Sequence, residues 1–341
     1  MRFAAVGTSV ITSWFVTGVG QVPDAEVACV VSRNADKGRT FADANGVADV
    51  ETSLDAALAR DDVDAVYIAS PNLIHVEQAL ASIAAGKHVL VEKSMAPSAN
   101  QARQIFEAAD AAGVVAMEAM RPVHTPAFVA LREAMGTIGD IRSSTFRYCQ
   151  RSGRLDKLRA GDVQPVFNPR LGGGSLSDIG IYVIEGMVAL FGAPEDVIAM
   201  GVMEDVPLPE GPEPVDIAGQ ALVRYPGHVA NLAWGKACSN YLATEIEGEN
   251  ASLSVDSIST PRSAAITRPA PSKDGYGTEE GVSEPLAFED PGSNNMRFEI
   301  ADFIAGVTGG PANLSVADAR EVTLASLALI DKIRPQLGVR P

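Results

Sequence analysis

The sequence predicts an α/β fold in two parts. Up to about residue 120, short apolar runs alternate with amphipathic, alanine-rich stretches, a pattern typical of a doubly wound parallel sheet with helices on both faces. After residue 122, extended stretches follow one another through tight turns, which predicts an α+β part with a large, mainly antiparallel open sheet. A chain of 341 residues is long enough for two such domains, and we set them at 1–121 and 122–341.

The N-terminal part is expected to contain five strands. Each is a continuous run of apolar residues rather than an alternating one, so helices should cover both faces of the sheet. The strands are expected at residues 2–6, 26–31, 64–69, 87–92 and 114–118. Helices are expected between them at residues 34–45, 75–86 and 98–113. In such a sheet, ligands bind at the carboxyl ends of the strands.

The C-terminal part is expected to begin with a helix at 125–135 and a strand at 141–150. A long loop with several arginines at 149–174 then leads into a glycine run and a second helix. This loop can line a pocket for a polar or anionic substrate, close over it as a lid, or be a solvated connector. Further extended stretches are expected at 195–203, 216–225, 228–238, 242–248 and 251–255.

The rest of the C-terminal part contains a hairpin, a loop and two helices. Pro226 and Gly227 predict the turn of a hairpin between two of the extended stretches. Residues 268–294 are rich in Pro, Gly, Ser and acids and predict a surface loop. Two final helices, at 294–307 and 315–338, are expected to close the chain and to pack partly on the first domain.

Composition excludes several classes of partner. The net charge of -16 argues against a nucleic acid or an anionic membrane surface, because both attract a basic protein. No apolar run approaches the roughly 20 residues that a membrane span requires. The first 20 residues resemble a weak signal peptide, but polar residues at 8–14 interrupt the apolar run, and a first strand and helix is the preferred interpretation.

The cysteines and histidines predict neither a disulfide framework nor a metal site. Cys29, Cys149 and Cys238 are far apart, with no C-x-x-C spacing, and the chain has only four histidines. We therefore expect no metal and a reducing, cytoplasmic location.

The first strand ends in a turn that partly matches a dinucleotide-binding motif. In "AAVGTSVITSW" (4–14), the G-x-G-x-x-G spacing falls on Gly7, Ser9 and Thr12. Gly7 keeps the tight bend, Ser9 offers a hydroxyl to a phosphate, and Thr12 should push the helix slightly away from the sheet. The helix N-terminus can bind an anion whatever its side chains are. Taken alone, the motif fits a plain strand, turn and helix equally well; as a cofactor site it would use Gly7, Thr8, Ser9, Val10 and Ile11.

The end of the second strand favours NADP(H), with NAD(H) still possible. NAD-binding folds usually place an acid there for the ribose 2'-hydroxyl, whereas an arginine accommodates a 2'-phosphate. This chain has Ser32 and Arg33, with Lys37 one helical turn later, and no acid at that point. The alternative interpretation of Arg33 is a solvent-exposed loop arginine.

Two later strands also end in polar residues at the carboxyl edge. "IASPNLIH" (68–75) contains Ser70, Pro71 and Asn72, and "GKHVLVEKSMA" (86–96) contains Glu92 and Lys93. A lysine at this edge can hydrogen-bond a substrate oxygen, although a solvated strand end is the simpler alternative.

These blocks resemble the Gfo/Idh/MocA oxidoreductase family. "SPNLIH" and "AGKHVLVEKS" are similar to its S/T-P-N-x-x-H and A-G-K-H-V-L-x-E-K-P signatures, and "MEAMRPVHTPAF" (117–128) to its M-E-x-x-x-x-R-x-x-P segment. "GGGSLSDIGIYVIEGMVALFG" (172–192) resembles the G-G-G-x-L-x-D-x-G-x-H/Y helix in the tyrosine branch, to which dihydrodiol dehydrogenase is similar. The resemblance covers nearly the whole chain and implies a Rossmann domain followed by an open-sheet domain.

The resemblance also implies roles for individual residues. Lys93 matches the catalytic lysine that holds the reacting oxygen, and Tyr182 matches the general acid/base, with Asp178 one helical turn before it. An adjacent ammonium would help to bring a tyrosine, with an ordinary pKa near 10, towards a working value. The implied cofactor contacts of this part are Ser70, Pro71, Asn72, His75, Glu92, Lys93 and Arg121, of which Asn72, His75 and Arg121 match positions towards the nicotinamide.

The substrate residues and three departures from the family pattern complete the prediction. His124 and Arg151 are candidate substrate contacts besides Asp178 and Tyr182. Ser94 replaces the proline of E-K-P and could loosen Lys93, Ser9 and Thr12 depart from the glycine motif, and Glu185 stands where the histidine branch has a substrate-binding Asp.

The implied activity is hydride transfer between NADP(H) and a hydroxyl or carbonyl carbon of a sugar, polyol or diol. Two alternatives are a dinucleotide-binding sensor or regulator without chemistry, and a redox-neutral NAD-dependent glycoside hydrolase of the same fold. We expect a small-molecule substrate, no nucleic-acid or membrane partner, and a homodimer or homotetramer formed through the open sheet.

Overall fold

The computed structural model describes residues 1–270, 281–292 and 294–339. The chain divides into two compact units. The first comprises residues 1–125 and 292–324, and the second comprises residues 126–291 and 325–341. The predicted boundary after residue 121 lies four residues before the end of the first segment, and residues 292–324 return to the first unit.

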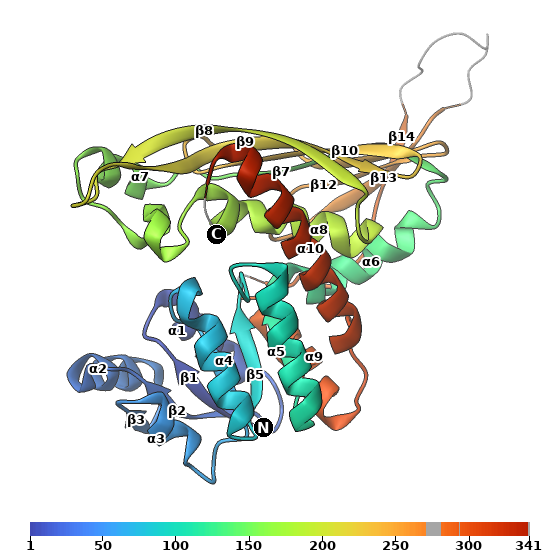
Figure 1. The fold of residues 1–341 in the computed structure, drawn as a ribbon. Helices are drawn as coiled ribbons and strands as arrows, with labels where there is room; N and C mark the ends of the chain where they lie inside the picture. Colours follow the sequence, from blue (N-terminus) through green and yellow to red (C-terminus); the bar gives the residue numbers. More distant parts are fainter. Residues whose placement is uncertain (271–280, 293, 340–341) are drawn as a thin grey trace. The chain divides into compact units, whose positions relative to one another are not determined.

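The first unit contains a six-stranded parallel sheet (Figure 1). Its strands are β1 (Arg2–Val6), β2 (Glu26–Val31), β3 (Asp49–Glu51), β4 (Ala65–Ile68), β5 (His88–Glu92) and β6 (Ala116–Ala119). Their order is β3-β2-β1-β4-β5-β6, so the direction of winding reverses between β1 and β4. The carboxyl ends of these two strands therefore mark the position where a doubly wound sheet binds its ligand. The predicted fold class is confirmed.

Helices cover this sheet, and aromatic packing holds one of them in place. The helices of the unit are α1 (Val10–Val19), α2 (Ala35–Asn45), α3 (Leu54–Leu58), α4 (His75–Ala84), α5 (Ala99–Ala112), α9 (Met296–Thr308) and the first part of α10 (Val316–Leu337). The Phe15 ring of α1 stacks on Tyr67 of β4 at 3.7 Å between centroids. A Cβ on Gly18 would lie 3.1 Å from Ile300 Cδ1, so α1 and α9 pack closely. This contact explains why the chain returns to the first unit after residue 291.

The second unit contains an eight-stranded sheet. Its strands are β7 (Ile141–Cys149), β8 (Asp196–Val206), β9 (Glu213–Tyr225), β10 (His228–Gly235), β11 (Thr244–Gly248), β12 (Ser252–Val255), β13 (Ala264–Arg268) and β14 (Val282–Pro285). Its helices are α6 (Pro126–Met135), α7 (Gly153–Arg159), α8 (Ile181–Phe191) and the rest of α10. Among the strands of this sheet that the structure describes, only β7 and β10 pair in parallel. Tyr225 pairs with His228, which confirms the predicted hairpin at Pro226 and Gly227.

Among the described α-helices and β-strands, five were not predicted: β3, α3, α7, β13 and β14. Strand β3 was not predicted, because a three-residue strand between polar residues carries no apolar run. The loop at 149–174 contains helix α7, whose Leu155 and Leu158 are buried with Phe167 against Val215. The segment at 268–294 is not entirely loop, because β14 pairs with β13. All four residues of β14 are exposed, so burial leaves no pattern there, and residues 271–280 lie outside the described residues.

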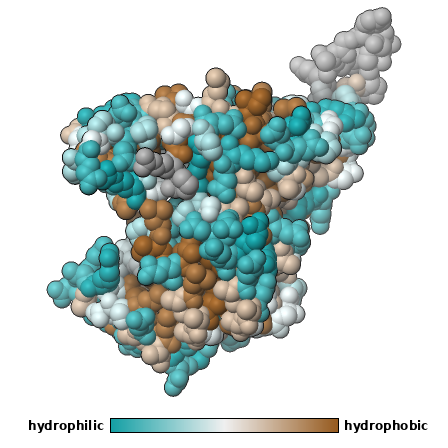
Figure 2. Space-filling model, in the orientation of Figure 1, coloured by the Kyte–Doolittle hydropathy of each residue, from teal (hydrophilic) through white to brown (hydrophobic). Residues whose placement is uncertain are grey.

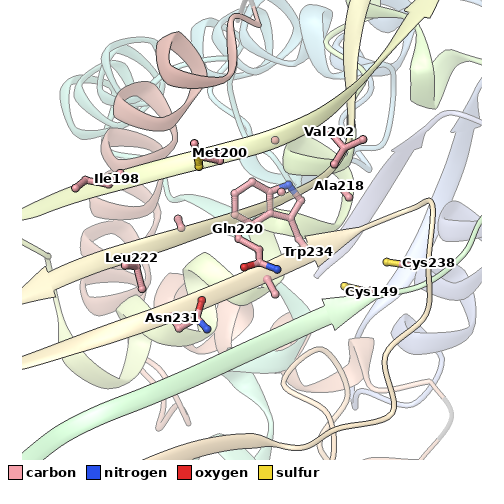
Figure 3. Close-up of a pocket in the computed structure, with 14 residues that line it drawn as sticks. Cys149, Ile198, Met200, Val202, Ala218, Gln220, Leu222, Asn231, Trp234 and Cys238 are labelled. Carbon is pink, nitrogen blue, oxygen red and sulfur yellow. The ribbon is translucent and has the colours of Figure 1, made fainter.

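One face of the sheet in the second unit carries exposed apolar side chains. Ile198, Met200 and Val202 alternate along β8 and are 58–79% exposed, and Leu222 of β9 is 54% exposed. They line a depression of about 520 Å³ (Figure 3), and hydrophobic residues reach the surface along this sheet in Figure 2. Gln336 of α10 hydrogen-bonds the backbone of β8, from Ala199 N at 2.8 Å and to Val197 O at 3.1 Å. The edge of the sheet formed by β8 is thereby covered.

No helix in the described residues combines the length and the apolarity needed to span a bilayer.

A cluster of buried ionisable groups lies beneath the carboxyl edge of the first sheet. Tyr67 Oη donates to Glu92 Oε1 at 2.6 Å, whereas neither carboxylate oxygen of the fully buried Glu299 has a hydrogen-bond partner within the described residues. Burial, followed by the charge of Glu92, raises the pKa of Glu299 well above its ordinary value, although Arg121 opposes this shift. Burial raises the pKa of Glu92 as well.

We expect the Glu299→Gln substitution to stabilise the protein at neutral and alkaline pH. In the folded protein Glu299 keeps its proton above pH 4.5, its ordinary pKa, whereas in the unfolded chain it releases the proton there. The free energy of unfolding therefore falls as the pH rises from 4.5 towards the pKa of Glu299 in the folded protein. A neutral amide removes this loss, by about 1–3 kcal/mol for a buried unpartnered group. Thermal unfolding between pH 5 and pH 8.5 measures it. Glu321→Gln, at an exposed position of α10 in the same unit, is the control, and equal pH dependence of both variants would contradict the expectation.

Candidate active site

The turn after β1 requires glycine at its first position only. Gly7 has φ +110°, and a Cβ there would lie 2.8 Å from Ala69 O. Ser9 is the N-cap of α1, its side chain makes no capping bond, and its hydroxyl lies 3.1 Å from that of Thr12. The first N–H groups of α1 therefore receive no side-chain cap and remain suited to an anion. Two hydroxyls in contact occupy the places of the second and third motif glycines.

A cavity of about 680 Å³ opens beside this turn within the first unit. Its volume suits a nucleotide-sized ligand. The predicted cofactor residues that line it are Gly7, Thr8, Ser9, Ser32, Arg33, Lys37, Ser70 and Pro71. Lining residues that the sequence analysis missed include Asn34, Thr52, Ser53, Leu54, Ile74, Glu77 and Gln78. Thr52, Ser53 and Leu54 follow β3, so recognition of that short strand would have revealed them. Val10, Ile11, Asn72, His75, Glu92, Lys93 and Arg121 are not among the residues that line this cavity.

Local capping organises the end of β2. Ser32 Oγ donates to Asn34 O at 2.9 Å, and Asn34 Oδ1 accepts from Lys37 N at 2.9 Å as the N-cap of α2. A Cβ on Gly38 would meet Val50 and Ser32, so α2 packs closely on this strand end. Arg33 and Lys37 are exposed, and both line the same cavity.

His75 is buried and joins two loops rather than lining the cavity. Its Nε2 lies 2.8 Å from Ser70 O and its Nδ1 lies 3.1 Å from Ser94 O. Burial lowers the pKa of His75, so the ring is neutral near pH 7 and donates from one nitrogen only. The imidazole connects the segment after β4 with the segment after β5.

Buried carboxylates hold the backbone on both sides of Lys93. Lys93 N donates to Glu92 Oε2 at 3.2 Å, and Met95 N donates to Glu118 Oε1 at 2.6 Å. The Lys93–Ser94 peptide bond is cis, although residue 94 is serine. The half-buried Lys93 therefore follows β5 on a backbone that is hydrogen-bonded into the core.

Arg121 and His124 lie on a short helix after β6 and contact α9 or its start. Arg121 Nη1 donates to Asn295 Oδ1 at 2.6 Å, and its guanidinium lies 5.6 Å from the centre of the Trp14 ring. His124 is fully buried, with its Nδ1 2.7 Å from Asp302 Oδ2. A ring packed in this way is a structural element of the first unit, and its burial does not support the predicted contact with substrate.

In the second unit, a buried acid fixes the segment that carries Asp178. Asp216 Oδ2 accepts from Ser175 Oγ at 2.5 Å and from Leu176 N at 2.7 Å. Gly174 has φ +135°, and a Cβ there would collide with the Asp216 carboxylate. These contacts account for the glycine run and the serine before the π-helical turn Leu176–Gly180. The turn continues directly into α8.

Asp178 and Tyr182 follow from this segment, and an unpredicted lysine joins them. Tyr182 is half-buried, and its ring packs edge-on against Tyr148 at 5.6 Å. Asp178 forms an ion pair with Lys236. Lys236 comes directly after the apolar strand in "VANLAWGK". A lysine directly after an apolar strand was also the signal that singled out Lys93, so the same signal could have identified Lys236.

Two further residues singled out in the sequence, Arg151 and Glu185, differ in their surroundings. Arg151 pairs with Asp156 at 2.6 Å on the surface, a pairing of small energetic value. Glu185 is buried in α8. The described residues contain no group of three or more His, Cys, Asp or Glu side chains suited to a metal ion.

Comparisons with known proteins identify the family. Residues 1–120 match the family model of the oxidoreductase family with an NAD-binding Rossmann fold, and residues 128–254 match the GFO/IDH/MocA C-terminal domain. The chain is 35% identical over 339 residues to scyllo-inositol 2-dehydrogenase (NADP(+)) of Bacillus subtilis, covering 99% of this chain and 98% of that protein. It is 31% identical over 235 residues to trans-1,2-dihydrobenzene-1,2-diol dehydrogenase of Mus musculus, covering 67% and 66%.

Solved structures agree with this assignment. A 3-ketoreductase from Actinomadura kijaniata, in complex with NADP and TDP-benzene, matches with a TM-score of 0.79 and 26% identity, covering 99% of this chain and 98% of that one. The motifs, the fold and both family models lead to the same conclusion: the chain is an oxidoreductase that belongs to the Gfo/Idh/MocA family.

Proposed function

We propose that this enzyme transfers a hydride between NADP(H) and a hydroxyl or carbonyl carbon of a sugar, polyol or diol. The observation that carries the proposal is Lys93, which follows β5 at the carboxyl edge of the sheet on a backbone held by Glu92 and Glu118. A fixed ammonium at this edge suits the binding of a reacting oxygen. The inositol and dihydrodiol dehydrogenases among the relatives support the class of substrate.

The first unit fits a dinucleotide. The uncapped N-terminus of α1 and the close turn at Gly7 suit a pyrophosphate, and Arg33 with Lys37 suits a 2'-phosphate. When bound, the nicotinamide supplies or accepts the hydride. We assign the binding of the whole dinucleotide to Gly7, Thr8, Ser9, Val10, Ile11, Ser32, Arg33, Lys37, Ser70, Pro71, Asn72, Glu92, Lys93 and Arg121. His75 supports the loops after β4 and β5.

Three side chains carry the proposed chemistry. Lys93 donates a hydrogen bond to the oxygen on the reacting carbon, and Tyr182 takes the hydroxyl proton when an alcohol is oxidised and returns it when a carbonyl is reduced. Asp178 accepts a hydrogen bond from the substrate. Loss of the hydroxyl proton and of the hydride leaves a neutral carbonyl compound as the product.

We further propose that the exposed apolar face of β8 and β9 binds a second copy of this chain, in a homodimer or in a homotetramer built from such pairs. A contiguous apolar patch of this kind is uncommon on a monomeric protein.

The three cysteines are free thiols, which is consistent with the cytoplasmic location that we propose.

We expect the Arg33→Ser substitution to weaken NADPH binding about tenfold or more and to leave NADH binding within a few-fold. A charge-assisted hydrogen bond to a 2'-phosphate contributes about 1.5–3 kcal/mol. Fluorescence titration with both nucleotides measures the preference. Arg39→Ser is the control, because Arg39 lies on α2, which begins two residues after Arg33, and pairs with Asp43. Equal affinity of the unaltered protein for NADPH and NADH would refute the role of Arg33.

We expect Lys93→Met to abolish turnover or to lower it by at least about 10²–10³-fold, because a donor to the reacting oxygen is lost. NADP+ reduction by a panel of aldoses, polyols and diols measures turnover, and NADPH affinity should stay within a few-fold. Unchanged turnover would remove Lys93 from the mechanism. A wild-type protein that binds NADPH but reduces NADP+ with none of these compounds would favour a sensor, and cleavage of a glycoside without net redox change would favour a hydrolase.

We expect Met200→Asp to convert the oligomer into monomers, because a charge in the centre of an apolar interface is desolvated without a partner. Light scattering coupled to size-exclusion chromatography gives the molar mass. Val282→Asp, at an exposed apolar position of β14 away from the patch, should keep the mass of the unaltered protein. A monomeric wild-type protein would disprove the interface.

A further inference from the structure

Lys236 is a buried cation that the proposed mechanism does not use. It follows β10, its side chain is only 8% exposed, and its ammonium forms an ion pair with Asp178, which is 58 residues away in sequence. Lysine is rarely buried to this degree unless its charge is paired. Removal of the Asp178 carboxylate would deprive the buried ammonium of this charge partner.

The ion pair is asymmetric in its exposure. The Asp178 side chain is 32% exposed, compared with 8% for Lys236. A polar ligand can therefore reach the carboxylate, while the ammonium stays behind it. This arrangement is typical of a supporting group that orients another group, rather than of a group that binds a ligand itself.

The backbone on which Lys236 stands is fixed. Lys236 N donates to Ile217 O at 2.8 Å, and Lys236 O accepts from Ser152 N at 2.9 Å. Asp216, one residue before Ile217, holds Ser175 and Leu176 at the start of the π-helical turn. The segment that carries Asp178 is thus held at its start by Asp216 and at its carboxylate by Lys236.

We propose that Lys236 is a positioning residue that holds the Asp178 carboxylate in the orientation that accepts a hydrogen bond from a substrate hydroxyl. This role rests on the proposed function and deepens it, because it assigns the enzyme a substrate with a second hydroxyl beside the reacting carbon. A carboxylate held as a fixed anion prefers a hydroxyl donor to a carbonyl oxygen. Lys236 acts only through Asp178 and touches neither the cofactor nor the reacting atoms.

The first test compares the kinetics of Lys236→Met and Lys236→Arg with a polyol that the wild-type enzyme oxidises. We expect Lys236→Met to lower kcat/KM for the polyol by about 10²-fold, the effect of a misplaced group, and to leave the KM for NADP+ within twofold. Lys236→Arg should recover most of the loss, since it retains the cation. Lys332→Met, at an exposed lysine of the same unit, is the control. Wild-type kinetics for Lys236→Met would overturn the proposal.

The second test is a double-mutant cycle with Asp178→Asn. If Lys236 acts through Asp178, then Lys236→Met causes no further loss of kcat/KM in the Asp178→Asn background. An additional loss of about 10²-fold in that background would show that Lys236 acts independently and would overturn the proposal. The double variant also removes the unpaired charge, so it remains foldable if Lys236→Met alone does not.

A third measurement separates failure of this inference from failure of the proposed function. The same cycle is followed by thermal unfolding, which requires no substrate. We expect the two substitutions to be coupled in stability, with each costing less in the presence of the other. Additive costs would overturn the pairing of Lys236 with Asp178. Absence of turnover by the wild-type enzyme would instead refute the proposed function.

Discussion

Buried carboxylates that accept backbone hydrogen bonds hold the segments on which the candidate catalytic groups stand. Glu92 and Glu118 accept N–H groups on the two sides of Lys93, and Asp216 accepts the N–H of Leu176 before Asp178. A buried anion must find donors, because its desolvation costs far more than one hydrogen bond returns. The loops around these acids are consequently specified in conformation, although loops usually vary.

One buried carboxylate in the first unit lacks such donors. Glu299 lies near Glu92 and Arg121 with no hydrogen bond to either carboxylate oxygen within the described residues. Such a group reduces stability at neutral pH, and residues that violate the rules of burial concentrate at functional sites. Glu299 lies near the nicotinamide-binding edge proposed above, and burial together with the charge of Glu92 raises its pKa, although the charge of Arg121 opposes this shift. In the second unit, by contrast, the Asp178 carboxylate forms an ion pair with the Lys236 ammonium.

Most of the fold could be predicted from the sequence, and so could eight of the residues that line the cavity beside Gly7, for identifiable reasons. The strands of the first sheet were predicted because burial on both faces requires continuous apolar runs, as in β4 and β5. The turn at Gly7 was predicted because a positive φ beside Ala69 O admits only glycine. In contrast, α7 was missed because only Leu155 and Leu158 of its residues are buried. Strand β14 was missed because none of its residues is buried.

The sequence by itself determined the class of fold, most of its elements and the family, and it singled out Lys93, Asp178 and Tyr182 as candidates, because these depend on local spacing and on apolar periodicity. Only the tertiary structure decided which distant groups stabilise them. Asp216 lies 40 residues from Leu176 and Lys236 lies 58 residues from Asp178, and packing of the π-helical turn against β9 and β10 brings each acid to its partner. His75 and His124 are packed between loops and helices: His75 contacts the backbone of Ser70 and Ser94, and the Nδ1 of His124 contacts Asp302, which is 178 residues away. Long-range pairing of this kind has no periodic signature, since it depends on where the sheet places each strand end.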